Sequence, residues 1–343
     1  MNSTTIAAIS TPFGNGGIGI IRLSGNRSVH IALSLFQRSH KKEPTGVTRD
    51  KAQLASHRFY HGKIIDPDTR EAIDEVLFVV MRAPKSYTRE DVVEIHTHSG
   101  PVVMEKIYEQ LLSAGASMAE PGEFTKRAFI NGRIDLTQAE AVADIIDAKS
   151  SMALKVANRH LAGGLSKKII PIRETLFEIN ALLEVSIDFS EDVQDDIQRG
   201  AMAEQLEEGV LKSIEKLLKN YEQDHFYRDG VKMAVIGRPN VGKSSLMNCL
   251  IKRDRSIVTA VPGTTRDVIE EMIHIKGLPL VIMDTAGLHD ALGEVEKIGI
   301  NKTRQSIKDA DIVLFMVDSS QPLCPEDVAI YSEIADKKHI VVK

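Results

Sequence analysis

The alternation of hydrophobic and polar positions changes character twice along this chain. In the first part, short apolar runs typical of strands, such as 76–80 and 91–96, are separated by Gly and Pro, and a helical stretch follows Pro101. From about 121 to 221 apolar side chains recur at every third or fourth position, which indicates helices. From Val231 onward strands alternate with helices, a pattern that predicts a parallel, doubly wound sheet.

This pattern predicts a multidomain protein with three parts. We expect an α+β domain over residues 1–119, an all-α helical domain over 120–222 and an α/β domain over 223–343. A chain of 343 residues is long enough for two or three domains, each with a hydrophobic core of its own.

Cysteine content and hydropathy narrow the class of protein. Cys249 and Cys324 are too few for a disulfide framework or a zinc site, which indicates a reducing compartment. The N-terminus lacks a basic stretch followed by a long apolar run, and no part of the chain approaches about 18 consecutive apolar residues. We therefore expect a soluble, cytoplasmic protein with no membrane segment.

The charge of the chain is divided unevenly. The total is −5, but residues 1–120 carry +1, residues 121–230 carry −6 and residues 231–343 carry 0. Because no segment is positive as a whole, any contact with RNA must use a local patch. The acid-rich run from Glu191 to Asp196 is expected to be a solvated loop between helices, with metal binding as the alternative.

Residues 237–244 form a complete Gly-x-x-x-x-Gly-Lys-Ser phosphate loop. It lies between a predicted strand, Val231–Ile236, and a helix predicted to begin near Ser245. In such a loop the backbone N–H groups surround a phosphate, the lysine (Lys243) reaches the β and γ phosphates, and the serine hydroxyl (Ser244) binds Mg²⁺. The chain is therefore predicted to bind a nucleoside triphosphate.

Two further elements accompany the phosphate loop. The run 262–267, Pro-Gly-Thr-Thr-Arg-Asp, offers an exposed threonine that can complete the Mg²⁺ shell, and an apolar strand ends in Asp-Thr-Ala-Gly at 284–287. Together the three motifs resemble a small GTPase of the translation-factor-related class. The predicted nucleotide-binding residues are Asn240, Val241, Gly242, Lys243, Ser244, Ser245, Thr259, Thr264, Thr265, Asp284, Thr285, Ala286 and Gly287.

The sequence identifies less directly the residues that recognise the base and those that orient the attacking water. Guanine is normally read by an Asn-Lys-x-Asp element after the fifth strand, and the sequence stops at Lys343, where that element should begin. We therefore expect a C-terminally truncated portion of a longer protein, with weak and poorly discriminating nucleotide binding by residues 1–343. Leu288 stands where Ras-like enzymes carry a water-orienting glutamine. Glu296 and a cation near Asn240 are candidates for that task, although Glu296 by itself also fits an ordinary solvated acid.

Two longer stretches identify a family. They are Gly-Asn-Gly-Gly-Ile-Gly-Ile-Ile-Arg-Leu-Ser-Gly at 14–25 and the run 121–144 from Pro-Gly-Glu-Phe through Gln-Ala-Glu. In this order with the GTPase motifs, they closely resemble the MnmE (TrmE) family of tRNA modification GTPases, over essentially the whole chain. The resemblance implies a folate-binding N-terminal domain and a helical domain interrupted by the GTPase domain.

The resemblance also implies an activity and partners. Family members form homodimers through the N-terminal domain and work with the flavoprotein MnmG on tRNA. They add a carboxymethylaminomethyl or aminomethyl group to C5 of the wobble uridine (U34). The implied cofactors are GTP, Mg²⁺, K⁺ and a tetrahydrofolate derivative (5-formyl- or methylene-tetrahydrofolate).

Residue roles carry over by motif. The resemblance implies Ser244 and Thr265 on Mg²⁺, a K⁺ site at Asn240, Thr259, Val261 and Thr264, Glu296 as the catalytic acid, and folate contacts from Arg22, Glu94 and Arg133. Family members usually carry Lys at the position of Arg133, which keeps the charge but changes the hydrogen-bond geometry. The family's C-terminal Cys-x-Gly-Lys tail does not occur in this sequence.

Two patterns in the first part suggest other chemistry. The run 14–19 satisfies Gly-x-Gly-x-x-Gly, but a strand-like sequence follows it instead of a helix, which argues against dinucleotide binding. Glu94, His96 and His98 alternate along one predicted strand and could bind a metal, with a folate pocket or plain packing as the alternatives.

Two other functions compete with the tRNA-modifying enzyme. One is a folate-binding scaffold whose GTPase domain acts only as a regulatory switch, and the other is a ribosome-assembly GTPase. The residues that precede the phosphate loop resemble the modification family and show no recognisable RNA-binding pattern, which argues against the ribosome-assembly alternative.

Overall fold

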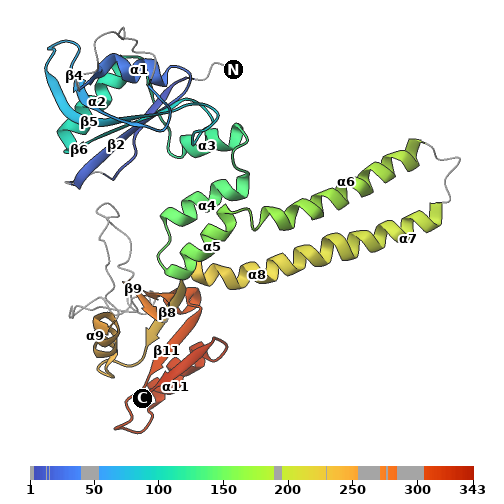
Figure 1. The fold of residues 1–343 in the computed structure, drawn as a ribbon. Coiled ribbons are helices and arrows are strands. Elements are labelled where there is room, and N and C mark those ends of the chain that lie inside the picture. Colours follow the sequence, from blue (N-terminus) through green and yellow to red (C-terminus); the bar gives the residue numbers. More distant parts are fainter. Residues whose placement is uncertain are drawn as a thin grey trace. The chain divides into compact units, whose positions relative to one another are not determined.

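A computed structural model describes residues 4–12, 14, 16–39, 54–188, 195–228, 230–253, 271–275, 277–283 and 305–343. The chain divides into two compact units, Met1–Glu140 and Ala141–Lys343 (Figure 1). The three-domain division at residues 119 and 222 stays a prediction.

A seven-stranded sheet forms the centre of the first unit. Its strands are β1 (Ile6–Ile9), β2 (Gly16–Ser24), β3 (Phe36–Arg38), β4 (Phe59–Ile65), β5 (Ala72–Met81), β6 (Val92–Ser99) and β7 (Ser117–Met118). The order is β3-β4-β5-β6-β2-β1-β7, and neighbours are antiparallel except for the parallel pair β1 and β7. The predicted strand run 76–80 lies within β5, and the predicted run 91–96 lies within β6 except for Asp91, which precedes it.

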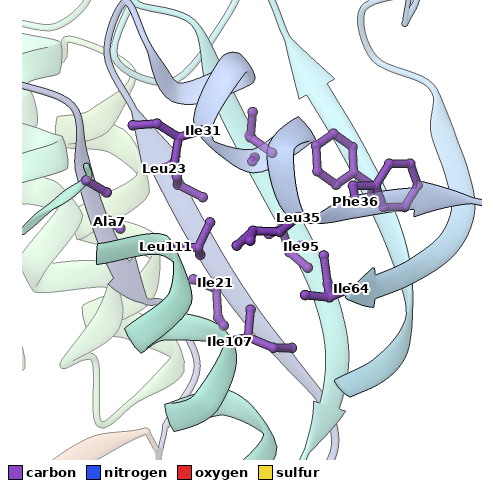
Figure 2. Packing of buried hydrophobic residues seen from close by; sticks show 14 of the residues in the cluster. Ala7, Ile21, Leu23, Ile31, Leu35, Phe36, Ile64, Ile95, Ile107 and Leu111 are labelled. Carbon is purple, nitrogen blue, oxygen red and sulfur yellow. The ribbon is translucent and has the colours of Figure 1, made fainter. Parts of the chain in front are cut away.

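Helices α1 (Ser28–Leu35) and α2 (Pro101–Ser113) pack against this sheet and close its core (Figure 2). The strand β2 shows how the sequence directs side chains, because successive strand residues point to opposite faces. Ile21 and Leu23 are fully buried in the core, whereas Arg22 between them is only half-buried. In the register of β2 and β6, Arg22 pairs with Glu94. The pleat therefore carries both charged side chains to the sheet face away from the core.

Helices α3 (Glu123–Ile130) and α4 (Leu136–Ile146) follow the sheet, and further helices open the second unit. They are α5 (Ser151–Leu161), α6 (Ser166–Asp188), α7 (Asp195–Gln205), the π-helix η1 (Leu206–Leu211) and α8 (Lys212–Arg228), and α6 runs alongside α7 and η1 (Figure 1). The acid-rich run is not a loop throughout, because α7 begins at Asp195. Carboxylates are favourable at a helix N-terminus, where the helix dipole is positive.

A five-stranded sheet follows α8. Its strands are β8 (Val231–Ile236), β9 (Glu271–Ile275), β10 (Leu278–Met283), β11 (Ile312–Met316) and β12 (His339–Val342), in the order β12-β11-β8-β10-β9. All pairs are parallel except β9 with β10. The sequence prediction of a parallel sheet is therefore wrong at β9, because the connection through Gly277 is too short for anything but an antiparallel hairpin.

The strand order places the phosphate loop. β8 lies at the middle of the sheet, and the chain continues to β10 on one side and to β11 on the other. Ligands of such sheets bind beyond the carboxyl ends of the strands at this kind of switch point. The loop 237–244 leaves β8 there and leads into α9 (Lys243–Arg253), while α11 (Pro325–Ile334) lies between β11 and β12 in the sequence.

Candidate functional site

The backbone of the phosphate loop requires glycine at defined places. Gly237 has φ of 154° and Gly242 has φ of 98°, both in the region that side chains disfavour. A Cβ atom at Gly237 would lie 2.4 Å from the carbonyl oxygen of Met316 on β11. Asn240 also has a positive φ, 66°, which asparagine tolerates better than most residues. The glycine pattern of the motif therefore matches the close approach of the loop to β11.

Lys243 lies across its own loop. Its Nζ atom donates to the carbonyl oxygens of Gly237, at 2.8 Å, and Arg238, at 2.6 Å. Burial lowers the pKa of Lys243. These two carbonyl dipoles hold the ammonium group over the backbone that the motif assigns to phosphate binding.

The other described nucleotide residues of the loop lie beside Lys243. Helix α9 begins at Lys243, two residues before the predicted start, so its N-terminal N–H groups lie at the loop. Ser244, Ser245 and Asn240 are exposed, whereas Val241 packs against a buried hydrophobic cluster formed by strands of the five-stranded sheet. The loop thus presents polar groups outward and is held by one apolar side chain.

The remaining predicted residues of this site lie outside the described part of the chain. They are Thr259, Val261, Thr264, Thr265, Asp284, Thr285, Ala286, Gly287, Leu288 and Glu296. Strand β10 ends at Met283, immediately before the predicted Asp-Thr-Ala-Gly element. Their roles stay predictions.

An ion pair that the sequence analysis missed ties the phosphate loop to α11. The Nε atom of Arg238 donates to Oδ1 of Asp327 at 2.8 Å, and Asp327 is 2% exposed. The backbone N–H of Cys324 donates to the other carboxylate oxygen at 3.1 Å. This backbone hydrogen bond and the Arg238 guanidinium hold the pKa of Asp327 below its usual range. No local motif signals the pair, because its members are 89 positions apart.

In the first unit the structure brings the three predicted folate residues together. Arg22 binds Oε1 of Glu94 through Nε at 2.8 Å and through Nη2 at 2.7 Å. The guanidinium of Arg133 lies 4.8 Å from the ring centroid of Tyr87 and donates to the Tyr87 carbonyl oxygen at 2.8 Å. The Arg22 guanidinium lies 5.7 Å from the ring centroids of both Tyr87 and Phe124. Two guanidinium groups therefore lie at the Tyr87 ring, and one of them, that of Arg22, also binds the Glu94 carboxylate.

Sequence reasoning missed Tyr87 and used Phe124 only as part of a family stretch. Tyr87 has no motif of its own, although its hydroxyl pairs with that of Thr125 at 2.9 Å and so fixes the ring. The approach of a cation to an aromatic face is a contact between separate elements. Only the folded chain reveals it.

The alternating residues Glu94, His96 and His98 turn toward different partners. The Nε2 atom of His96 lies 3.4 Å from Oε2 of Glu94, a long contact, whereas Nδ1 of His98 lies 2.7 Å from Oδ1 of Asp74. Among the described residues no group of three or more His, Cys, Asp or Glu side chains is placed to hold a metal ion. The run 14–19 leads into β2, a strand, as the sequence predicts.

Of the helices that the structure describes, none combines the length and the apolar character needed to cross a membrane.

Comparisons with known proteins match both ends of the chain to families. Residues 5–133 match the family described as the N-terminus of the GTP-binding protein TrmE. Residues 232–343 match the family described as 50S ribosome-binding GTPase. The solved structure of an Era variant from Aquifex aeolicus bound to GDP.AlF4- is 31% identical, covers 32% of this chain and 38% of that chain, and has a TM-score of 0.24.

Relatives match nearly the whole chain. The tRNA modification GTPase MnmE of Lactobacillus helveticus is 48% identical over 338 residues, which are 98% of this chain and 71% of that protein. The protein of the same name from Desulfotalea psychrophila is 47% identical over 341 residues, 99% of this chain and 71% of that protein. Identity of this extent, together with the two family matches, shows that the chain belongs to the MnmE family of tRNA modification GTPases.

Proposed function

We propose that this protein hydrolyses GTP and couples hydrolysis to modification of tRNA at C5 of the wobble uridine (U34). With the flavoprotein MnmG, it would add a carboxymethylaminomethyl or aminomethyl group and take the one-carbon unit from a tetrahydrofolate derivative. The observation that supports this most directly is the phosphate loop at the carboxyl end of β8, whose Lys243 side chain donates hydrogen bonds to the loop's own backbone carbonyls. The membership of the chain in this family supports it further. The proposal includes a homodimer formed through the N-terminal domain and a cytoplasmic location.

The phosphate loop supports a specific first step of nucleotide binding. Lys243 now donates to Gly237 and Arg238, so its ammonium group must exchange these carbonyl oxygens for phosphate oxygens when GTP binds. Its burial favours this exchange, because a buried cation gains more from an anionic partner than from two neutral dipoles. The N–H groups at the start of α9 would face the same phosphates.

The predicted metal and hydrolysis residues complete this proposal. Ser244 would hold Mg²⁺ with Thr265, and Asn240, Thr259, Val261 and Thr264 would hold K⁺, which supplies positive charge at the β and γ phosphates. Ser244 and Asn240 lie in the phosphate loop with exposed side chains, which suits them to bind Mg²⁺ and K⁺. Glu296 would hold the attacking water, a task that Leu288 cannot perform.

The cluster around Tyr87 supports folate binding in the first unit. Oε1 of Glu94 is occupied by Arg22, whereas Oε2 has only the long contact to His96. Oε2 is therefore the oxygen that can accept hydrogen bonds from a pterin amino group and ring N–H. Arg22 and Arg133 suit the carboxylates of a folate, and the Tyr87 ring offers an apolar face for its aromatic rings.

Mass spectrometry of nucleosides in tRNA from a strain that lacks this protein tests the proposed function. We expect the wobble uridine modification to disappear and to return when the protein is supplied again. A strain without the protein whose wobble uridines stay fully modified contradicts the proposal.

A ribosome-assembly GTPase is the second candidate, because residues 232–343 match a family described as ribosome-binding. The match of residues 5–133 to the TrmE N-terminus favours tRNA modification instead. Co-sedimentation with 50S subunits in a GTP-dependent manner would favour the ribosome. A third candidate is the folate-binding scaffold whose GTPase domain acts only as a regulatory switch. Measurable GTP turnover that disappears in Glu296→Ala separates the enzyme from this scaffold.

A further inference from the structure

The basic residues of the helical region are concentrated in one short stretch. Between Asp147 and Glu174 the sequence contains six Lys and Arg residues and no carboxylate, although residues 121–230 as a whole carry a net charge of −6. The six are Lys149, Lys155, Arg159, Lys167, Lys168 and Arg173. A segment that is acidic overall therefore contains one strongly positive part.

The fold places four of these six charges on either side of a single helix–helix junction, because α5 carries Lys155 and Arg159 and the start of α6 carries Lys167 and Lys168. Helix α5 ends in a turn in which the N–H of Gly163 donates to His160 at 2.8 Å and the N–H of Gly164 donates to Arg159 at 2.9 Å. This pair of bonds, with φ of 79° at Gly163, is the arrangement of a Schellman motif. A Cβ at Gly164 would lie 2.7 Å from the Arg159 carbonyl oxygen. The turn holds the end of α5 close to the beginning of α6, and α6 starts at Ser166.

Four of the cations on this junction are exposed and unpaired among the residues that the structure describes. We call Lys155, Arg159, Lys167 and Lys168 the α5–α6 basic surface, since all four are exposed. None of them takes part in an ion pair with another described residue. Lys155 and Arg159 are four positions apart and therefore share one face of α5. By contrast, Lys212 at the start of α8 forms an ion pair with Glu208 of η1.

Two of these lysines stand where a helix disfavours them. Lys167 and Lys168 lie in the first turn of α6, which has no acidic residue. The N-terminal end of a helix carries positive partial charge and favours anions, so two lysines there repel both the dipole and each other. An anion bound at this end would relieve the repulsion. A phosphate-rich ligand suits both the lysines and the N–H groups of the first turn.

We propose that the α5–α6 basic surface binds the phosphate backbone of tRNA. This inference rests on the proposed function, which makes tRNA the substrate, and adds the part of the chain that contacts it. The charge distribution supports the choice of RNA, because no large segment of the chain is positive and a local patch must therefore attract the polyanion. Four cations without interspersed carboxylates suit a backbone of repeated phosphates.

The salt dependence of tRNA binding tests this inference. Fluorescence anisotropy of labelled, unmodified tRNA with the full chain would be measured between about 50 and 200 mM KCl. In the variant Lys155→Gln/Arg159→Gln/Lys167→Gln/Lys168→Gln we expect the slope of log K against log [KCl] to become shallower by about 3, because each lost phosphate contact removes about 0.7–0.9. Affinity at the lower salt should fall at least about tenfold. Glutamine keeps the helix propensity close to that of Lys and Arg, so both helices should persist, which circular dichroism checks.

A control variant distinguishes the effect of this surface on tRNA binding from the effect of removing positive charge elsewhere. Lys216→Gln/Lys219→Gln removes two exposed lysines of α8, whose surroundings contain several carboxylates, and should leave the slope unchanged. An unchanged slope in the fourfold variant would overturn the inference, and so would a chain that binds no tRNA. Loss of binding to anionic lipid vesicles with tRNA binding intact would assign the surface to a membrane instead.

The two proposals can fail separately. If the fourfold variant loses tRNA affinity while wobble uridines stay modified in a strain without the protein, the RNA surface stands and the proposed function falls. If the modification disappears in that strain while the fourfold variant binds tRNA with the original slope, the reverse holds.

Discussion

Arg238 and Asp327 form an ion pair, 2.8 Å from Nε to Oδ1, that joins the phosphate loop to the first turn of α11. Asp327 also caps that helix through the N–H of Cys324. One buried carboxylate therefore stabilises a helix end and the second residue of the phosphate loop together. A substitution of Arg238 therefore also affects α11, although neither residue is among the predicted nucleotide-binding residues.

We expect Arg238→Ala to lower the thermal midpoint of unfolding and to weaken GTP binding, because a buried carboxylate loses its cation and the loop loses an anchor. Arg238→Ala/Asp327→Ala should restore part of the midpoint, since no unpaired charge then remains. Lys232→Ala, which removes an exposed cation of β8, is the matched control and should change neither quantity. A GTP affinity in Arg238→Ala equal to that of the unsubstituted protein would show that the loop does not need the pair.

The same pair predicts a response to acid. The pKa of Asp327 is lowered in the folded chain by the Cys324 N–H and by Arg238, relative to 3.8 for an unperturbed aspartate. A carboxyl group with a depressed folded pKa adds stability above its unfolded pKa, and this stability is lost as the pH falls through the folded pKa. We expect the difference in urea midpoint between the protein and Asp327→Asn to be constant from about pH 7 to 5 and to shrink below about pH 4. A difference that stays the same at low pH would exclude ionised Asp327 as its source.

Gly237→Ala should disrupt the phosphate loop. The added methyl group would lie 2.4 Å from the Met316 carbonyl oxygen, which is backbone and cannot turn away, at a φ that alanine disfavours. We expect loss of measurable GTP binding and a lower unfolding midpoint. Gly200→Ala is the control, because that glycine lies in α7 with nothing within 4 Å of a new Cβ, and it should stabilise the helix by roughly 0.5–1 kcal/mol. Normal GTP binding by Gly237→Ala would show that the loop backbone can move away from β11.

Glu94→Ala should abolish tetrahydrofolate binding and leave GTP affinity unchanged, because the two candidate sites lie in different units. A carboxylate contributes charge-assisted hydrogen bonds of roughly 1.5–3 kcal/mol each, so the loss of two should weaken binding by about two to four decades. Isothermal titration calorimetry measures both affinities. Glu75→Ala, which removes an exposed carboxylate of β5, should bind tetrahydrofolate normally. Unchanged folate affinity in Glu94→Ala would remove Glu94 from the site.

The ring of Tyr87 should matter more than its hydroxyl group. Tyr87→Leu loses the aromatic face beneath Arg22 and Arg133, so each guanidinium group loses a positioning contact of about 0.5–1 kcal/mol. We therefore expect folate affinity to fall, by roughly 30-fold at most. Tyr87→Phe keeps the ring and loses only the hydrogen bond to Thr125, so it should retain most of the affinity. If both variants lose the same amount, the hydroxyl group and not the ring carries the contribution.

Much of the candidate nucleotide site is determined by the sequence alone. The phosphate loop is contiguous, so the spacing of Gly237, Gly242 and Lys243 defines both its chemistry and its conformation, and the apolar strand before it makes it the end of β8. The family stretches at 14–25 and 121–144 likewise contain Arg22 and Arg133, two of the three residues that the resemblance implies for folate binding. These features are local in the chain, and local backbone preferences are sufficient to specify them.

Other features were decided by tertiary structure. Asp327 meets Arg238, and Tyr87 meets Arg22 and Arg133, only because sheets and helices bring distant segments into contact, and no spacing in the sequence encodes such a pairing. The basic stretch of α5 and α6 is visible in the sequence as a change in charge. Its exposure, its lack of partners among the described residues and its place at a tight helix junction depend on how the chain packs. Packing is a collective outcome of many weak contacts, so these relationships exist only in the folded molecule.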